Sequence, residues 1–111
     1  MAIYSNLTVD QGSNFLAYID VTDSSGNALN LTGYTVAGQI RKTYSSLTAI
    51  NFIATVNDAT GGTISLSLVD SVTNTMKAGR YVYDVEILAA SGSRTRVLEG
   101  QVEVTPGVTQ V

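Results

Sequence analysis

Two carboxylates at alternate positions are the residues of this chain best placed for acid–base or metal chemistry. Asp84 and Glu86 are two residues apart within the stretch 78–88. Side chains two apart in a strand point to the same face, so the two carboxyl groups would lie side by side. Such a pair can share a proton or bind a cation. The alternative is an ion-paired sheet face, because Arg94 and Arg96 follow on the next predicted strand and can supply opposite charge.

Other constellations for catalysis or metal binding are weak. The chain has no histidine and no cysteine, which removes the commonest general base, the commonest metal ligand and the thiolate nucleophile. Asp20, Asp23 and Asn27 surround a glycine-containing turn, but their spacing is that of an Asx turn rather than a calcium loop. Ser–Lys catalysis would need a buried lysine, and nothing around Lys42 or Lys77 indicates one. We therefore predict no catalytic residue, no cofactor and no metal.

Length and charge narrow the class of protein further. The 111 residues fit one domain, with six Lys and Arg against nine Asp and Glu, for a net charge of -3. No basic run indicates nucleic-acid binding, and no window approaches the roughly 18 apolar residues of a membrane span. The start lacks the pattern of a signal peptide. Only 14% of residues are charged, against about 25% in an average domain, which favours a chain that hides surface in an assembly.

The stretch 78–88 also predicts the central strand of the fold. After Gly79 it alternates strictly, and Tyr81, Tyr83, Val85 and Ile87 would face the core. Six further strands are predicted from the same period of two. They cover residues 3–10 (at an edge), 14–22, 34–42, 49–57, 63–68 and 94–105.

These segments predict an all-β protein. We expect an antiparallel, immunoglobulin-like β-sandwich of about seven or eight strands, with a small barrel as the alternative. One short helical turn is expected near residues 70–77, capped by Ser71, with Val72 and Met76 closing one end of the core. Gly38, inside a predicted strand, indicates a bulge or a close backbone approach. The domain would span residues 1–105, and residues 106–111 would form a C-terminal tail.

Apolar residues at the outward positions of the strands form a candidate interface. Several such residues on neighbouring strands would mark a surface that contacts other subunits, unless loops cover them. The candidates are Leu16, Tyr18, Ile53, Val82, Leu88, Val97 and, in a Ser/Thr-rich loop, Tyr44. Tyr4, Tyr18 and Tyr44 are also the candidates for stacking on sugar rings.

Three stretches carry a resemblance to a known group. They are Asp-Gln-Gly-Ser at 10–13, Leu-Thr-Gly-Tyr-Thr-Val running on to Gln-Ile-Arg-Lys at 31–42, and Met-Lys-Ala-Gly-Arg-Tyr-Val-Tyr-Asp-Val-Glu at 76–86. The chain from Tyr4 to Thr105 resembles the small immunoglobulin-like virion structural proteins of tailed bacteriophages, of the contractile-tailed marine phage type. It is similar in plan to the N-terminal domain of phage baseplate upper proteins.

The resemblance implies a virion protein without an active site. It would be a capsid decoration or cement protein, or a component of the tail, neck or baseplate, assembled in the host cytoplasm. Its partners would be other capsid, tail or baseplate subunits, and it would form an oligomer in the particle, with no nucleic acid or membrane bound. Residues 102–111 could add to the edge of a neighbouring sheet. A carbohydrate- or host-surface-binding adhesion module is the alternative.

Overall fold

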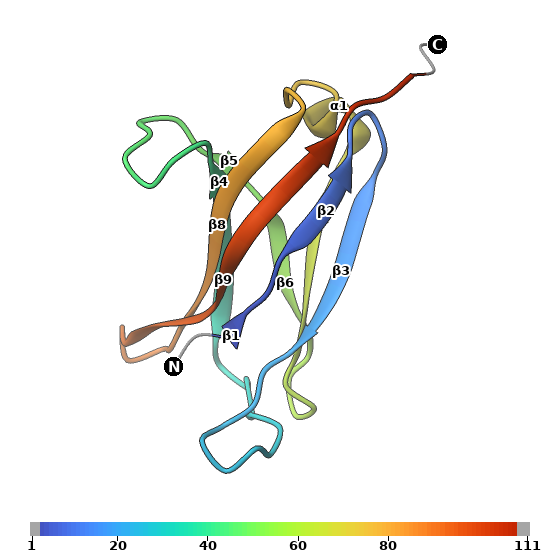
Figure 1. The fold of residues 1–111 in the computed structure, drawn as a ribbon. Helices are drawn as coiled ribbons and strands as arrows, with labels where there is room; N and C mark the ends of the chain where they lie inside the picture. The colour runs from blue at the N-terminus through green and yellow to red at the C-terminus, as the bar shows by residue number, and fades with distance from the viewer. Residues whose placement is uncertain (1–2, 109–111) are drawn as a thin grey trace.

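The computed structural model describes residues 3–108, which form two β-sheets packed face to face (Figure 1). The larger sheet has the order β1-β9-β8-β4-β5, and β2 also pairs with β9. Its strands are β1 (Ile3–Tyr4), β2 (Leu7–Asp10), β4 (Thr35–Arg41), β5 (Ile50–Asn51), β8 (Gly79–Leu88) and β9 (Arg94–Thr105). The smaller sheet has the order β3-β7-β6, made of β3 (Phe15–Asp20), β7 (Thr63–Leu68) and β6 (Ile53–Asp58). The chain is therefore a β-sandwich, as predicted.

Strand β8 is central, as its alternation predicts. It pairs antiparallel with β9 along its whole length and with β4 over seven residues. Tyr83, Val85 and Ile87 are buried, and Tyr81 is half-buried against the core. The facing positions of β7, which are Ile64, Leu66 and Leu68, are buried from the other sheet. The core thus lies between two strands whose inward residues follow a period of two.

The N-terminal segment departs from the prediction in two ways. Residues 3–10 form two short strands rather than one, and both run parallel to β9, not antiparallel. The break falls at Ser5, whose carbonyl lies over Gly100 of β9. A β-carbon at Gly100 would lie 2.8 Å from the Ser5 carbonyl carbon and closer still to its oxygen. The Tyr83 hydroxyl donates a hydrogen bond to that same oxygen, so the Ser5 carbonyl at the break between β1 and β2 has a specific hydrogen-bond partner.

The predicted strand 49–57 is also divided, because it changes sheets at Phe52. β5 pairs with β4 in the larger sheet, whereas β6 pairs with β7 in the smaller one. The buried Phe52 ring contacts the rings of Phe15 and Tyr83 at centroid distances of 6.2 and 6.0 Å. Gly38 makes room for it, since a β-carbon there would lie 3.0 Å from the Phe52 ring. The close approach predicted at Gly38 is confirmed.

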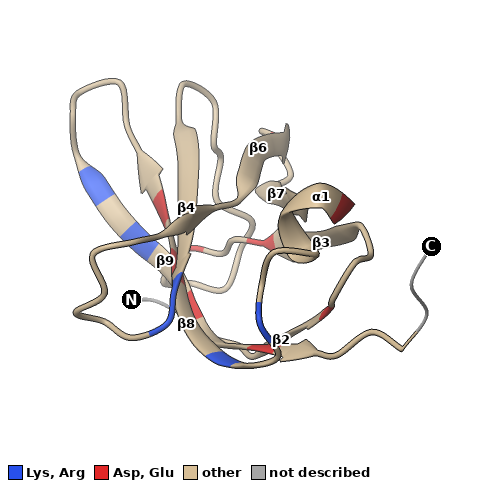
Figure 2. Cartoon of the chain, turned by 90° about the horizontal axis from the view of Figure 1, so that it is seen from above, with Lys and Arg blue, Asp and Glu red and all other residues tan. Residues whose placement is uncertain are grey.

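Helix α1 (Asp70–Thr73) closes one end of the sandwich, beside the β2–β3 connection (Figure 2). Ser71 does not cap it; the helix starts after Val69, and the Asp70 amide donates to Asn14 Oδ1 at 2.8 Å. Thr73 is fully buried and its hydroxyl donates to the Ser13 carbonyl at 2.8 Å. These bonds hold the turn against the loop after β2. Met76 is buried, as predicted, and Val72 packs partly buried against the core.

A bulge in β9 changes which side chains face outward. Val85 is opposite Leu98, but Glu86 is opposite Arg96, so Val97 is an extra residue without a partner on β8. Val97 packs against the core. The prediction that Val97 faces away from the core is therefore wrong, because a strict alternation does not anticipate the inserted residue.

The close approach at Gly100 makes a stability prediction. Gly100→Ala should lower the free energy of unfolding by about 2–3 kcal/mol, because the added methyl group must displace a backbone carbonyl. Urea unfolding followed by circular dichroism measures it. Gln101→Ala, at the neighbouring exposed position, should change stability by no more than about 0.5 kcal/mol. Equal stability of the two variants would contradict the packing described.

Tyr83 makes a pH prediction. Burial raises the pKa of Tyr83 from 10.0 to about 12, despite the opposing effect of its hydrogen bond to Ser5. Below pH 10 the phenol is neutral in both folded and unfolded chains, so its contribution is complete. Between pH 10 and 12 only the unfolded chain ionises, and the free energy of unfolding should fall by up to about 1.4 kcal/mol per pH unit. Unfolding curves of Tyr83→Phe should lack this part of the pH dependence; parallel profiles for the two proteins would contradict the assignment.

Candidate functional site

The two carboxylates predicted as a chemical pair are each paired with an arginine. Arg96 Nε lies 3.2 Å from Asp84 Oδ2, and Arg94 Nε lies 3.5 Å from Glu86 Oε2. The interpretation of Asp84 and Glu86 as ion-pair partners on a sheet face is confirmed. All four side chains are between 34% and 66% exposed, so both pairs are in contact with water.

The β9 bulge makes these pairs possible. Arg96 is opposite Glu86, and Arg94 is opposite Leu88. Each arginine therefore reaches diagonally to the acid two residues earlier on β8. Arg94 and Arg96 lie four and two residues before the buried Leu98, so strict alternation along β9, without the bulge, would turn both arginines toward the core. The bulge thus places cations and carboxylates on one outer face.

A network of polar side chains continues across that face onto β4. Gln39 Nε2 donates to Asn51 Oδ1 at 2.9 Å, and Arg41 Nη2 donates to Gln39 Oε1 at 3.1 Å. Arg41 Nη1 also donates to the Ser46 carbonyl in the loop 42–49. The Arg41 guanidinium therefore ties this loop to the sheet.

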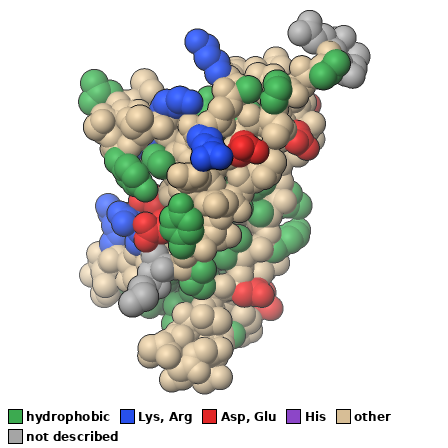
Figure 3. All heavy atoms as spheres, viewed as in Figure 1, with side chains coloured by type: hydrophobic (Ala, Val, Ile, Leu, Met, Phe, Trp, Pro, Cys, Tyr) green, Lys and Arg blue, Asp and Glu red, His purple; other side chains and the backbone are tan. Residues whose placement is uncertain are grey.

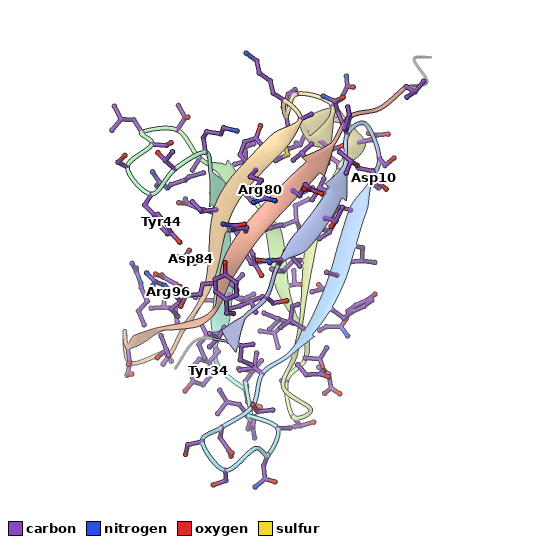
Figure 4. All side chains as sticks on the ribbon, viewed as in Figure 1. Asp10, Tyr34, Tyr44, Arg80, Asp84 and Arg96 are labelled. Atoms are coloured by element: carbon purple, nitrogen blue, oxygen red, sulfur yellow. The ribbon has the colours of Figure 1, made fainter. Side chains whose placement is uncertain are left out.

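Tyr44 projects from the loop that Arg41 holds. Its side chain is 80% exposed. Figure 4 shows it pointing along the sheet toward the side where Asp84 and Arg96 lie. Tyr44 and these two residues line the same hollow of about 640 Å³ on the outer face of the larger sheet. The hollow is also lined by Ala37 and, from the inward side of the strands, by Val36, Phe52 and Tyr83.

Six of the seven predicted interface residues separate into two surfaces, and the seventh, Val97, packs against the core. Leu16, Tyr18 and Ile53 lie on the outer face of the smaller sheet and are 58%, 61% and 53% exposed. Leu16 and Ile53 both lie opposite Ser67 of β7, so they occupy one row across the three strands. We call Leu16, Tyr18 and Ile53 the partner face.

The remaining predicted interface residues lie on the larger sheet. Val82, Leu88 and Tyr44 line the hollow described above. The two sheets turn their outer faces in opposite directions, so these residues cannot form one surface with the partner face. Sequence reasoning placed all seven together because alternation gives the face of a strand but not the sheet to which the strand belongs.

The aspartates of the 20–27 segment hold a turn. Asp23 Oδ1 accepts hydrogen bonds from the amides of Ser25 and Asn27 at 2.9 and 3.0 Å, which is an Asx turn as interpreted from the sequence. Asp20 Oδ1 accepts from the Thr63 hydroxyl on β7. Among residues 3–108, no group of three or more acidic, histidine or cysteine side chains could hold a metal.

Sequence reasoning did not single out Gln39, Arg41 and Asn51 as site residues. The alternation of the 34–42 stretch places Gln39 and Arg41 outward, beside the outward acids of the stretch 78–88. That signal can be used only if the two strands are known to be neighbours. Identification of Asn51 also requires knowledge of where the chain changes sheets.

No family model and no curated protein matches this sequence. Among solved structures, CopC from Methylosinus trichosporium OB3b has a TM-score of 0.52 at 13% identity, over 96% of this chain and 89% of CopC. An internalin-like protein from Listeria monocytogenes has a TM-score of 0.47 at 18% identity, over 96% of this chain and 28% of that one. A family 123 glycoside hydrolase from Clostridium perfringens has 0.41 at 13%, over 95% and 23%. The CopC likeness supports the β-sandwich fold alone, and the other two carry no argument.

Within the described part of the chain, no helix is long and apolar enough to cross a membrane.

The ion pairs predict a small coupling energy. In a double-mutant cycle with Asp84→Asn and Arg96→Gln, the coupling should be about 0.2–1 kcal/mol and should shrink at high salt, because both side chains contact water. Urea unfolding at low and high ionic strength measures it. A salt-independent coupling above about 2 kcal/mol would instead indicate a desolvated pair and contradict the exposure described.

Proposed function

We propose that the chain is a non-enzymatic structural protein of a tailed-phage virion. In this proposal it acts as a capsid decoration or cement protein, or as a neck, tail or baseplate component, through contacts with other virion proteins. The resemblance of residues 4–105 to such proteins suggests the class. The observation that carries the proposal is the partner face, where three large apolar side chains are each more than half exposed.

The chemistry around the partner face suits a protein contact. Ser65 and Ser67 of the central strand lie between the apolar residues of the two outer strands. The Thr55 and Ser65 hydroxyls lie 2.6 Å apart, within hydrogen-bond distance of each other. The middle of the face is thus neutral, and its apolar area can be buried without stranding a charge. Burial of three large side chains gives about 1.5–3 kcal/mol each, before the cost of association.

Repetition would convert such a contact into stable attachment. One face of this size gives weak binding by itself, but a particle presents many equivalent sites, and linked sites gain affinity through effective concentration. β3 and β6 are the outer strands of the smaller sheet, so a partner on this face also meets strand edges. Residues 102–105 are not available for that purpose, because 102–104 pair with both β8 and β2 and Thr105 pairs with β2. Of the proposed C-terminal strand, 109–111 lie outside the described residues.

The test is the location of the chain. Particles should be purified by density gradient from a lysate of the host that carries the gene, and analysed by mass spectrometry and electron microscopy. We expect the chain to migrate with the particles. A copy number comparable with the capsid subunit would indicate decoration, and a single ring of copies would indicate the neck, tail or baseplate. Absence from every particle fraction would contradict the proposal.

Removal of the partner face should release the chain from particles. Leu16→Ser combined with Ile53→Ser should reduce the bound fraction about tenfold or more, because two buried apolar side chains are lost. Leu47→Ser is the matched control: Leu47 is 98% exposed in the 42–49 loop, away from the partner face. Both proteins should unfold at similar urea concentrations. Retention of the double variant at the level of the control would exclude the partner face as the contact.

A further inference from the structure

The outer face of the larger sheet carries a second surface, made of paired and hydrogen-bonded side chains, which the proposed function does not use. Its hollow of about 640 Å³ falls within the range of small-ligand sites, roughly 300–1,000 Å³. Paired red and blue side chains with green hydrophobic ones beside them are visible over β8 and β9 in Figure 3. We call this surface the groove. On the outer face it comprises Ala37, Gln39, Arg41, Tyr44, Asn51, Val82, Asp84, Glu86, Leu88, Arg94 and Arg96, and buried residues such as Phe52 and Tyr83 also line the hollow.

The hydrogen-bonding groups of the groove are mutually oriented. Each carboxylate is held by an arginine, at 3.2 Å for Asp84 and 3.5 Å for Glu86. A guanidinium has five N–H donors and a carboxylate about four acceptor sites, so each pair retains capacity for a ligand. Gln39 and Asn51 add an amide pair. Such adjacent donors and acceptors match vicinal hydroxyl groups, which both donate and accept.

Aromatic rings flank the polar pairs. Tyr44 lies on the loop side. On the other side, Tyr4 of β1 lies opposite Glu99, and Glu99 lies opposite Asp84. Residues directly opposite in a ladder share a face, so Tyr4 points to the same side as Asp84, and it is 62% exposed. Tyr18, the third candidate, lies on the other sheet. Two exposed rings beside polar pairs provide faces against which sugar C–H groups can pack.

The arrangement of the Tyr44 loop favours a preformed site. Arg41 bonds both the Ser46 carbonyl and Gln39, so the loop that carries Tyr44 is tied to the groove wall. The Thr43 amide donates to the Ser46 hydroxyl at 3.0 Å within the same loop. A ligand therefore meets Tyr44 on an anchored loop, which lowers the entropic cost of binding.

Other ligand classes fit the groove less well. Asp84 and Glu86 line the groove and Glu99 lies opposite Asp84 on the same face, so three carboxylates disfavour a polyanion such as a nucleic acid. An extended peptide binds by pairing with a free strand edge. β8 is paired on both sides, and on the outer edge of β4 Gly38 accepts from the Phe52 amide while Gln39 and Ile40 pair with β5, which leaves a short edge at the start of β4. On the outer face of the groove the aliphatic side chains are those of Ala37, Val82 and Leu88, which give an apolar helix little surface to pack against.

We propose that the groove binds a neutral oligosaccharide, with Tyr44 stacking on a sugar ring and the Asp84–Arg96 and Glu86–Arg94 pairs bonding vicinal hydroxyls. Tyr4 extends the site by one further ring position toward β1. The groove and the partner face lie on opposite sides of the sandwich, so a chain attached to a particle by the partner face would present the groove outward. Sugar binding does not depend on the virion role, and either can fail without the other.

The experiment uses the full chain and two steps. A glycan microarray carrying neutral, sialylated and uronic acid oligosaccharides identifies the strongest neutral probe. That probe is then titrated into isotopically labelled protein to about 10 mM, well above a weak Kd of about 1 mM, while amide chemical shifts are followed. We expect shifts concentrated in β4, β8 and the 42–49 loop. No binding to any neutral glycan, a preference for acidic glycans alone, or shifts confined to β3, β6 and β7 would overturn the proposal.

Matched tyrosine variants separate the groove from the rest of the surface. Tyr44→Ala should weaken binding of the probe about tenfold or more, since a stacked ring is lost. Tyr18→Ala removes a comparably exposed ring from the opposite sheet and should leave the Kd unchanged. Tyr44→Phe keeps the stacking surface and should retain most of the affinity. Equal loss in Tyr44→Ala and Tyr18→Ala, or no loss in Tyr44→Ala, would exclude the site. The particle-binding assay should give the reverse order for the two alanine variants.

Discussion

The fold depends on one close approach, where the Ser5 carbonyl lies over Gly100 and accepts a hydrogen bond from the buried Tyr83 hydroxyl. Three segments meet there: the N-terminal strands, the last strand and the central strand. A side chain at position 100 would separate the first from the second, and a phenylalanine at 83 would leave the carbonyl without this donor. Because Tyr83 also contacts Phe52, the same ring connects this edge to the point where the chain changes sheets.

The sandwich separates two kinds of surface by charge. The smaller sheet faces outward with hydroxyls between Leu16, Tyr18 and Ile53, because its central strand β7 alternates apolar and small polar residues. The larger sheet gathers the arginine–carboxylate pairs on its outer face. An interface that buries apolar area requires the first kind, and recognition of hydroxyl-rich ligands requires the second. A single β-domain can therefore carry an attachment surface and a recognition surface without competition between them.

Alternation alone predicts most of the fold. The bounds of β7 and β9 and the inward residues of β8 follow from a period of two, because one face of each strand is buried. What alternation cannot give is the path of the chain between sheets. Phe52 belongs to a run that reads as one strand, and its division depends on the space left by Gly38 on a strand distant in sequence. The candidate site follows the same rule: Asp84 and Glu86 could be identified, but Arg41 and Asn51 could be placed beside them only once strand order was known.

Because of the bulge at Val97, the positions of residues along β9, as well as their identity, decide which side chains face outward. The extra residue shifts the alternation by one position. Before the bulge, even-numbered residues such as Arg94 and Arg96 face outward, whereas after it even-numbered residues such as Leu98 face the core. If β9 alternated strictly, with no bulge, both arginines would face inward like the buried Leu98 and could not form this outer face. A related chain that lacks Val97 would keep Arg96 opposite Glu86 and Arg94 opposite Leu88 in a regular ladder. The outward position of the two arginines therefore depends on how Val97 is accommodated in β9 and not on the composition of the strand alone. The hairpin tip at Ser91–Ser93, by contrast, lies beyond the bulge and can vary in length without changing the phase.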